Sequence, residues 1–477
     1  MHALKLCAAM AALLIATAAV GPAGAQVTDT PPPVKKTKKA KAAPKAPVAP
    51  VAPSPDATAP PAAPAPAATP APAAPSAQTT AGDVGTHPPK RPLPPPPHEN
   101  CKNTGNFATW LDAFRRKAAA QGISQRTIAA ALGGQTLNSS VLARDRQQSF
   151  FAQTFLDFQA KLATPNRVQS SRRKVAENKA TFDRVQKDFG VPASVITGFW
   201  ALESDFGAGM GKFPIMPALV TLAYDCRRTE MFNDELMAAL QIIDRGDMSP
   251  SEMIGSWAGE IGQTQFLPTR YLDYAIDYDG SGHPDLFRSD ADVIGSTANY
   301  MHNLGWRAGE PWLEEVRLTA DLPWQEADLL IKHPLDKWSA WGVRRVDGSP
   351  LPKSNLTASL LLPMGRNGPA FLAYPNFDVY TQWNQSLNYA TTAAYLATRI
   401  DGAPAMGRGR GPIVGLDRLQ TQELQGLLAK RGYDVGKIDG LAGQKTRTAV
   451  KDMQMKLKMP ADSYPTPELL AAVRGGG

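Results

Sequence analysis

A glutamate stands inside an apolar helical pattern near the middle of the chain. Ser194 can cap this predicted helix and Gly207 can end it. Ile196, Trp200 and Glu203 follow the spacing i, i+4, i+7, so Glu203 shares a face with apolar side chains. Burial disfavours the charged form of a carboxyl and raises its pKa, as a general acid working near neutral pH requires. From these residues alone, the alternative is a buried glutamate with a structural partner.

The segment Phe199-Trp-Ala-Leu-Glu-Ser-Asp-Phe-Gly207 resembles the catalytic motif of the lytic murein transglycosylase B family, which cleaves peptidoglycan glycan strands. The resemblance covers about 101–402 and continues through 256–268, 275–287, 294–300, 374–377 and Tyr389. Residues 413–474 resemble the peptidoglycan-binding domain type 1, through Gly432-Tyr433 and Ile438-Asp439-Gly440.

The resemblance implies a fold and a reaction. The fold is mainly α, with a lysozyme-like helical catalytic domain that carries a small β insertion, and a three-helix peptidoglycan-binding domain. Glu203 would protonate the oxygen between N-acetylmuramic acid and N-acetylglucosamine and would then act as base on the muramoyl C6 hydroxyl. The product is a 1,6-anhydromuramoyl end. Because the internal hydroxyl is already held close, neither water nor a protein nucleophile is needed.

Matched position by position, the resemblance also implies polar side chains around Glu203. Neutral donors and acceptors suit the hydroxyl and N-acetyl groups of a sugar. The implied substrate-binding residues are Ser256, Gln265, Tyr300, Asn384 and Tyr389. For Tyr300 and Tyr389 the alternative is core packing with a satisfied hydroxyl. Two departures from the family pattern, Gln263-Thr264 and Trp383, affect the expected details of saccharide binding.

The Asp/Gly-rich segment at 275–287 suggests a cation loop. The odd positions of a calcium loop are occupied by Asp277, Asp279, Ser281, the carbonyl of His283 and Asp285. Position twelve is Arg288 instead of a bidentate Glu, so the resemblance implies closure by Asp292, with Asp290 as an alternative. We expect a weak structural calcium ion and no cofactor in the reaction. The alternative is a turn held by its own side-chain hydrogen bonds.

Two other readings of the chemistry are open. A hydrolytic muramidase on the same scaffold would need a second positioned carboxylate, and the candidates are Asp205 and Glu260. Asp205 points to another face of the helix than Glu203, and Glu260 is expected to be a solvated loop carboxylate. A non-catalytic peptidoglycan-binding scaffold would lack the acid, whereas Glu203 is present.

The elements that must position these residues are predicted from periodicity. Helical stretches are expected at 107–118, 125–132, 140–162, 172–189, 194–206, 231–244, 290–304 and 386–400. Strand-like alternation is limited to 313–318 and 356–363, so 101–402 should be mainly helical with a small β insertion. Residues 403–412 are a Gly/Pro-rich linker, and 413–474 should form three short helices.

The N-terminal hundred residues differ in composition from the rest. Residues 1–25 have the pattern of a cleaved signal peptide that ends in Ala23-Gly24-Ala25, with an uncleaved anchor as the alternative. Residues 26–100 are rich in Pro, Ala and Lys and should be a disordered linker. We therefore expect a periplasmic protein, without a lipid anchor and without a transmembrane helix in the mature chain.

The cysteines and the net charge bear on the compartment of the protein and on the type of partner that it binds. Export leaves Cys101 and Cys226, and an even count in an oxidising compartment predicts one disulfide, with two separate thiols as the alternative. The formal net charge of +8 could indicate a nucleic-acid-binding protein. The signal sequence and the absence of clustered basic residues in 101–402 argue against that class. The expected partners are peptidoglycan glycan strands.

Overall fold

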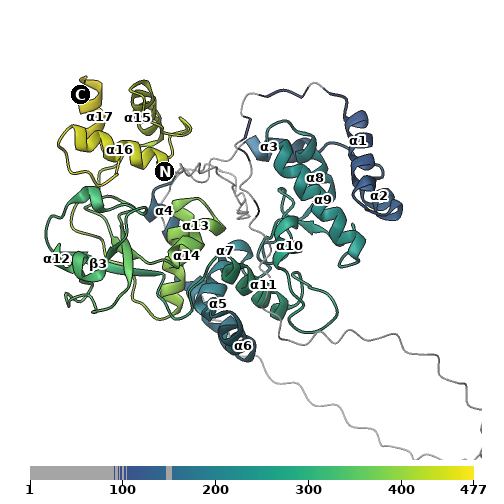
Figure 1. Cartoon of the computed structure of the whole chain (residues 1–477), viewed down its shortest axis with the longest axis horizontal. Helices are drawn as coiled ribbons and strands as arrows, with labels where there is room; N and C mark the ends of the chain where they lie inside the picture. Colours follow the sequence, from purple (N-terminus) through teal and green to yellow (C-terminus); the bar gives the residue numbers. More distant parts are fainter. Residues whose placement is uncertain are drawn as a thin grey trace, which may run out of the picture. The chain divides into compact units, whose positions relative to one another are not determined.

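The structure is a computed structural model that describes Arg91, Pro95, Pro97, His98 and residues 101–103, 105–146 and 153–476. The predicted signal peptide (1–25) and most of the predicted linker (26–100) lie outside these residues. The described part is mainly helical, with a five-stranded sheet and a separate two-stranded pair, which confirms the predicted fold class (Figure 1). No helix in this part of the chain is long and apolar enough to cross a membrane.

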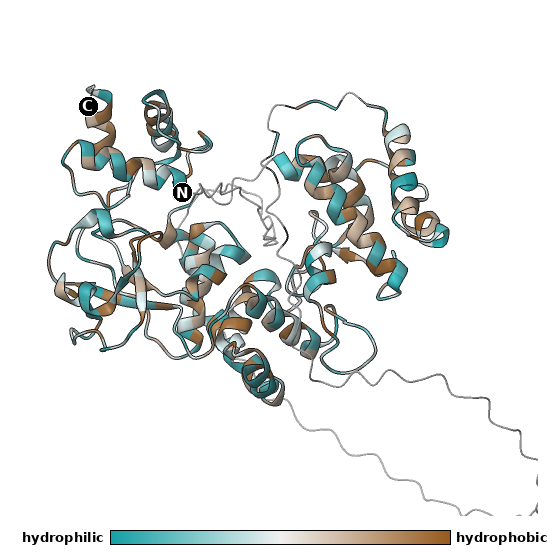
Figure 2. Ribbon diagram, in the orientation of Figure 1, coloured by the Kyte–Doolittle hydropathy of each residue, from teal (hydrophilic) through white to brown (hydrophobic). Residues whose placement is uncertain are grey.

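One group of helices encloses a core that contains Leu219, Leu236 and Tyr271. Its members are α1 (Phe107–Ala120), α2 (Gln125–Leu132), α3 (Ser139–Arg146), α8 (Ile215–Tyr224), α9 (Thr229–Arg245) and α10 (Pro268–Tyr274). Helices α8 and α9 pack against each other, and α10 packs against α9. In Figure 2, α9 carries both hydrophobic and hydrophilic residues, as expected for a helix with one buried side.

A second group of helices surrounds α7 (Ala193–Ser204), which carries Glu203. The other members are α4 (Phe155–Leu162), α5 (Pro165–Glu177), α6 (Lys179–Phe189), α11 (Asp290–Asn303), α13 (Phe377–Trp383) and α14 (Leu387–Ile400). Every residue of α7 from Ser194 to Ser204 is buried. A helix that is apolar all round needs neighbours on all sides, and α5, α11 and α14 pack against α7.

Some predicted helix limits were wrong. The N-cap of α7 is Pro192, and Ser194 lies inside the helix without a capping bond. The helix ends at Ser204, because Asp205 adopts a left-handed conformation with φ 48°. The helix predicted at 172–189 is two helices, α5 and α6, which meet at Asn178 where φ is −109° and ψ is 25°. Non-helical backbone at one residue interrupts the helical hydrogen bonds although the apolar spacing continues.

A five-stranded antiparallel sheet lies between α11 and α13 in the chain. Its order is β4-β6-β7-β3-β5. The strands are β3 (Leu313–Leu318), β4 (His333–Pro334), β5 (Val343–Arg345), β6 (Thr357–Leu361) and β7 (Ala370–Ala373), accompanied by η2 (Trp324–Glu326) and α12 (Leu335–Ala340). The predicted strands at 313–318 and 356–363 correspond to β3 and β6. A separate two-stranded pair, β1 (Phe213–Pro214) and β2 (Ile254–Gly255), directly precedes residues 256–268, the second of the matched segments, which is called the second sequence motif below.

The C-terminal segment forms a small helical unit. It consists of α15 (Arg418–Lys430), α16 (Gln444–Lys456) and α17 (Pro467–Arg474), around a core that includes Leu428, Val450 and Leu470. A capping box of Asp417 and Gln420 starts α15. The buried Arg447 on α16 donates to the carbonyl of Leu362, 2.6 Å away, next to strand β6.

Cys101 and Cys226 form the predicted disulfide, with Cα atoms 5.9 Å apart. The bond joins the segment before α1 to the turn between α8 and α9. Around it, Tyr224 donates its hydroxyl to the carbonyl of Gly105, and the backbone nitrogen of His98 donates to the carbonyl of Arg227 at 2.7 Å. The disulfide and these two hydrogen bonds together hold the segment before α1 against the turn between α8 and α9.

Candidate active site

Glu203 lies in the last turn of α7 and is 3% exposed. Its Oε1 atom accepts a hydrogen bond from the indole Nε1 of Trp383 at 2.9 Å and another from the hydroxyl of Tyr389. Trp383 ends α13 and Tyr389 lies in the first turn of α14, so these two helices and α7 each contribute a side chain to this hydrogen-bonded group. Helices α7, α13 and α14 lie close together in Figure 1.

Burial raises the pKa of Glu203 to about 7. The main cause is the loss of water around the carboxylate, and the hydrogen bonds from Tyr389 and Trp383 oppose it by stabilising the charged form. The same burial and the nearby Glu203 raise the pKa of Tyr389 well above its usual value, so Tyr389 stays a neutral donor. A carboxyl in this setting can both give and take a proton near neutral pH.

The second sequence motif holds α7 in place through Gln263. The side-chain oxygen of Gln263 accepts a hydrogen bond from Trp200 Nε1 at 2.8 Å, and its backbone carbonyl accepts one from Ser204 Oγ at 2.5 Å. Its Nε2 donates to the carbonyl of Phe287 at 3.0 Å. One glutamine thus connects the helix of Glu203 to the Asp/Gly-rich loop.

Ser256 supports the motif loop from inside. Its side chain is fully buried, and its Oγ accepts hydrogen bonds from the backbone nitrogens of Ala258 and Glu260 at 3.1 and 3.2 Å. The structure therefore places Ser256 in the frame of the loop, although the sequence assigned it to the substrate. Its two bonds stabilise a tight turn next to Gly259, which has φ 82°.

Gln265 and Asn384 each retain a buried polar atom that forms no hydrogen bond with a described residue. Gln265 has φ 53°, an unusual conformation for a residue with a side chain, and its Nε2 donates to the carbonyl of Gly262 at 2.8 Å. Asn384 accepts a hydrogen bond from the backbone nitrogen of Ser386 at 2.9 Å. The atoms that no described residue bonds are Gln265 Oε1 and Asn384 Nδ2. A buried polar atom of this kind is available to a ligand.

Tyr300 and Tyr389 are buried side chains, 7% and 0% exposed. Tyr300 stacks on Tyr274 with ring centroids 4.5 Å apart and lies 5.1 Å from the ring of Trp383. The structure thus places Tyr300 in the aromatic packing beneath the site. Tyr389, which the sequence assigned to the substrate, contacts the candidate acid directly.

The two other candidate carboxylates occupy different environments. Asp205 is exposed and forms a two-point ion pair with Arg167, with N–O distances of 2.8 Å, on another side of the helix end. Glu260 is 1% exposed, so the expectation of a solvated loop carboxylate was wrong. The loop folds inward because Ser256 Oγ holds the backbone nitrogen of Glu260. The charge of Glu260 raises the pKa of Tyr389.

Three aspartates of the Asp/Gly-rich segment approach one another. Carboxylate oxygens of Asp277, Asp279 and Asp292 all lie within 4.8 Å of each other. Asp292 is buried and accepts hydrogen bonds from the backbone nitrogens of Tyr278 and Asp285 at 2.6 and 2.8 Å. Oxygen ligands at this spacing suit a hard cation such as calcium.

The remaining predicted ligands of the loop are less favourably placed. Asp285 binds Arg288 at 2.8 Å, and Asp290, the alternative closing residue, binds Lys174 at 2.9 Å. The carbonyl of His283 accepts a hydrogen bond from Ser281 Oγ at 3.3 Å. Hydrogen bonds within the loop are thus present, as the alternative expected, beside the three convergent carboxylates.

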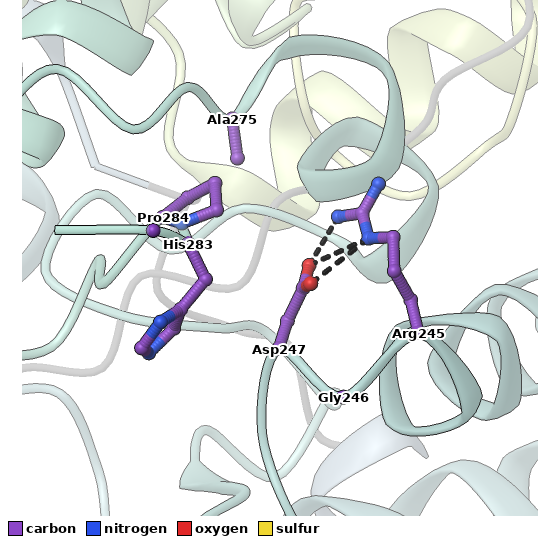
Figure 3. A pocket seen from close by; sticks show the side chains of 7 residues that line it. Arg245, Gly246, Asp247, Ala275, His283 and Pro284 are labelled. Atoms are coloured by element: carbon purple, nitrogen blue, oxygen red, sulfur yellow. Dashed lines mark hydrogen bonds and ion pairs between the residues drawn. The ribbon is translucent and has the colours of Figure 1, made fainter. Parts of the chain in front are cut away.

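A cavity of about 420 Å³ opens between the end of α9 and the Asp/Gly-rich loop (Figure 3). Figure 3 shows Arg245 paired with Asp247 on one side and His283 and Pro284 on the other. Glu203 is not among the residues that line this cavity. The volume is therefore separate from the carboxyl group that the sequence singled out.

Two family comparisons agree with this geometry. Residues 106–398 match the transglycosylase SLT domain, and residues 418–473 match the peptidoglycan binding domain. The chain belongs to the transglycosylase SLT domain family. It is an enzyme, a lytic transglycosylase, with a C-terminal peptidoglycan-binding domain. The matched ranges lie within the domains predicted at 101–402 and 413–474.

Individual relatives of this lytic transglycosylase cover most of its folded part. It is 31% identical to membrane-bound lytic murein transglycosylase B of Escherichia coli, over 52% of this chain and 67% of the relative. SltB3 of Pseudomonas aeruginosa, solved with NAG-anhNAM-pentapeptide, is 41% identical with a TM-score of 0.72, over 77% of this chain and 99% of SltB3. Slt35 of Escherichia coli, solved with calcium, is 28% identical with a TM-score of 0.54, over 64% of this chain and 97% of Slt35.

The sequence missed two contacts of the lytic transglycosylase site. Trp383 and Gln263 stood out as departures from the family pattern, but nothing in their local sequence indicated their hydrogen-bond partners. The bond from Trp383 to Glu203 joins residues 180 positions apart, and the bond from Trp200 to Gln263 joins residues 63 positions apart. The sequence signal that could have pointed to these contacts was the departure of Trp383 and Gln263 from the family pattern.

Proposed function

We propose that this transglycosylase cleaves the β-1,4 bond between N-acetylmuramic acid and N-acetylglucosamine and forms a 1,6-anhydromuramoyl end. Glu203 acts first as acid and then as base. The observation that carries this proposal is the buried carboxyl group of Glu203, which has a pKa of about 7 and accepts hydrogen bonds from two neutral donors. Such a group is protonated often enough to start the reaction and becomes a usable base once it has lost its proton.

The steps balance with one carboxyl group. Glu203 gives its proton to the bridging oxygen, and the bond from that oxygen to muramoyl C1 breaks. The C6 hydroxyl oxygen then bonds to C1 while its proton passes to Glu203, which returns to the acid form. Because the attacking hydroxyl belongs to the same sugar, the step has the advantage of an intramolecular reaction.

Gln265 and Asn384 are the proposed contacts to the sugar. Each has one buried polar atom that no described residue bonds, and amides can bind both hydroxyl and N-acetyl groups. Ser256 holds the loop before Gln265, Tyr300 packs against Trp383, and Tyr389 donates to Glu203, so these three buried residues shape the site from within. The relative SltB3 has been solved with NAG-anhNAM-pentapeptide and with NAG-NAM-pentapeptide, which supports peptidoglycan strands as the substrate class.

Hydrolysis is the second candidate, because Glu260 is buried and electrostatically close to Tyr389. A water molecule activated by Glu260 would yield a reducing muramoyl end instead of the anhydro end. The ion pair with Arg167 argues against Asp205 in that role. The identity of the sugar end therefore separates the two candidates.

The test is digestion of purified peptidoglycan by the mature chain, beside Glu203→Gln and Glu260→Gln, with mass spectrometry of the released muropeptides. We expect anhydromuramoyl ends from the parent and from Glu260→Gln, and no product from Glu203→Gln. Reducing ends that disappear in Glu260→Gln would establish hydrolysis. Binding to peptidoglycan without product from the parent would indicate a non-catalytic scaffold.

We also propose a periplasmic location, with residues 1–25 removed as a signal peptide and 26–100 acting as a linker. The disulfide between Cys101 and Cys226 supports an oxidising compartment. For the cation, we propose a weak structural calcium ion held by Asp277, Asp279 and Asp292. The solved calcium complex of Slt35 supports this assignment. The proposed reaction requires no cofactor.

A further inference from the structure

The two oxygens of the Glu203 carboxyl group have different surroundings. Oε1 accepts hydrogen bonds from both Trp383 Nε1, at 2.9 Å, and the Tyr389 hydroxyl. Among the described residues, no group donates to Oε2. In the acid form, the oxygen with two donors is favoured as the carbonyl oxygen, and the proton is favoured on the other oxygen.

Aromatic side chains from several parts of the chain fix the position of Trp383. Its ring centroid lies 4.5 Å from that of Phe199, 5.1 Å from Tyr300 and 5.8 Å from Phe266. Trp383 packs against both helical cores and is partly exposed. A ring held on several sides keeps its N–H in one direction, as a preorganised donor requires.

Burial raises the pKa of Glu203, and the hydrogen bonds from Tyr389 and Trp383 lower it. The charged residues near Glu203 and Trp383 have other partners or act on Tyr389. Arg167 lowers and Glu260 raises the pKa of Tyr389, and Arg167 is itself bound by Asp205. On α5, Lys174 lies over the ring of Trp200 at 5.1 Å and binds Asp290. For Glu203, burial favours the acid form, and Tyr389 and Trp383 provide the opposing stabilisation of the carboxylate.

We propose that Trp383 is a positioning residue for Glu203, an inference that rests on the function proposed above. With Tyr389, Trp383 occupies Oε1 and directs the transferable proton to Oε2. When Oε2 protonates the bridging oxygen and the bond to C1 breaks, the carboxylate shares its new charge with Oε1, where the indole donates. Oε2 then takes the proton of the C6 hydroxyl as the C6 oxygen bonds to C1.

Trp383→Phe keeps an aromatic ring and removes the donor. We expect kcat to fall roughly ten- to hundred-fold, because a hydrogen bond to a charged group is lost. The basic limb of the pH–rate profile should move up by about one pH unit, because the carboxylate loses stabilisation. The matched control is Trp306→Phe, which removes an indole bond to the carbonyl of Gly190, 3.0 Å away, in the same core. The control should leave the pH limb unchanged.

The pKa of Glu203 in the mature chain can be measured without turnover by ¹³C NMR titration of its side-chain carboxyl, assigned with Glu203→Gln. We expect an upward shift of about one unit in Trp383→Phe and none in Trp306→Phe. Benzothienylalanine at position 383 preserves the bicyclic shape, replaces N–H by sulfur and should give the same shift. It replaces Trp383→Phe if that variant does not fold.

The outcomes are separable. An unchanged Glu203 pKa in the folded Trp383 variants would overturn the proposal. A rise in KM with an unmoved pH limb would also overturn it, since Trp383 would then serve only as a contact for the sugar. If the parent releases no anhydromuramoyl ends, the proposed function fails, while the NMR titration still decides whether Trp383 controls the Glu203 carboxyl.

Discussion

The indole nitrogen of Trp200 donates to the side-chain oxygen of Gln263 at 2.8 Å, and this bond connects the helix of Glu203 to the second sequence motif. Trp200 stands one turn before Glu203 on α7. The same glutamine accepts from Ser204 Oγ through its backbone and donates to the carbonyl of Phe287. The position of the candidate acid therefore depends on Gln263, although the hydrogen bonds that Glu203 itself accepts come from Trp383 and Tyr389.

Replacing Gln263 by Leu should lower both stability and activity. The Trp200 indole would lose its acceptor in a buried setting, which costs about 1–3 kcal/mol. Urea denaturation would measure the change in unfolding free energy, and muropeptide release would measure activity. Gln125→Leu, at an exposed position at the start of α2, is the control and should change neither. Wild-type stability in Gln263→Leu would contradict the structural role of this bond.

The activity should fall as the pH rises through about 7, because the reaction starts from protonated Glu203, whose pKa is about 7. Burial also raises the pKa of Glu235 to about 7, with Thr269 Oγ1 donating to it at 2.9 Å. Glu235→Gln should leave the fall of activity near pH 7 unchanged, because Glu203 controls that fall. A limb that moves in Glu235→Gln would exclude Glu203 as its origin.

The same two glutamates should make the protein less stable as the pH rises from about 4.5 to about 7. Their pKa values in the folded state lie above the ordinary value, so the folded state binds more protons than the unfolded state in this window. Glu203→Gln and Glu235→Gln should each flatten the pH dependence of the unfolding free energy, by roughly 1–3 kcal/mol across the window. Parallel curves for parent and variants would contradict the assigned shifts.

Millimolar calcium should raise the melting temperature, because an ion that binds only the folded state stabilises it. Asp277→Asn should abolish most of this rise, since Asp277 belongs to the group of three aspartates. Asp290→Asn is the control, because Asp290 binds Lys174 instead. Differential scanning calorimetry with calcium and with chelator measures the effect. No calcium-dependent shift in the parent would remove the site.

Loss of the disulfide between Cys101 and Cys226 should destabilise the fold. The bond closes a loop with a sequence separation of 125 residues, and the chain-entropy estimate for such a loop is about 4–5 kcal/mol. The double variant Cys101→Ala, Cys226→Ala should melt at a lower temperature than the oxidised parent. Adding a reductant should lower the melting temperature of the parent but not of the double variant.

The sequence by itself determined the local features of this protein. Apolar spacing predicted α9, α11 and α14 nearly to their ends, and it placed Glu203 on a buried helix. These successes have one cause, because helical periodicity depends on residues three and four positions apart. The break at Asn178 between α5 and α6 escaped this reasoning, since the apolar spacing continues across it.

Only the tertiary structure decided which groups contact Glu203. Trp383 and Tyr389 lie 180 and 186 positions away, and the packing of α13 and α14 around α7 brings them to one oxygen atom. The burial of Glu260 likewise arises from the turn built on Ser256. Hydrogen bonds and desolvation act between neighbours in space, and local sequence spacing does not specify those neighbours.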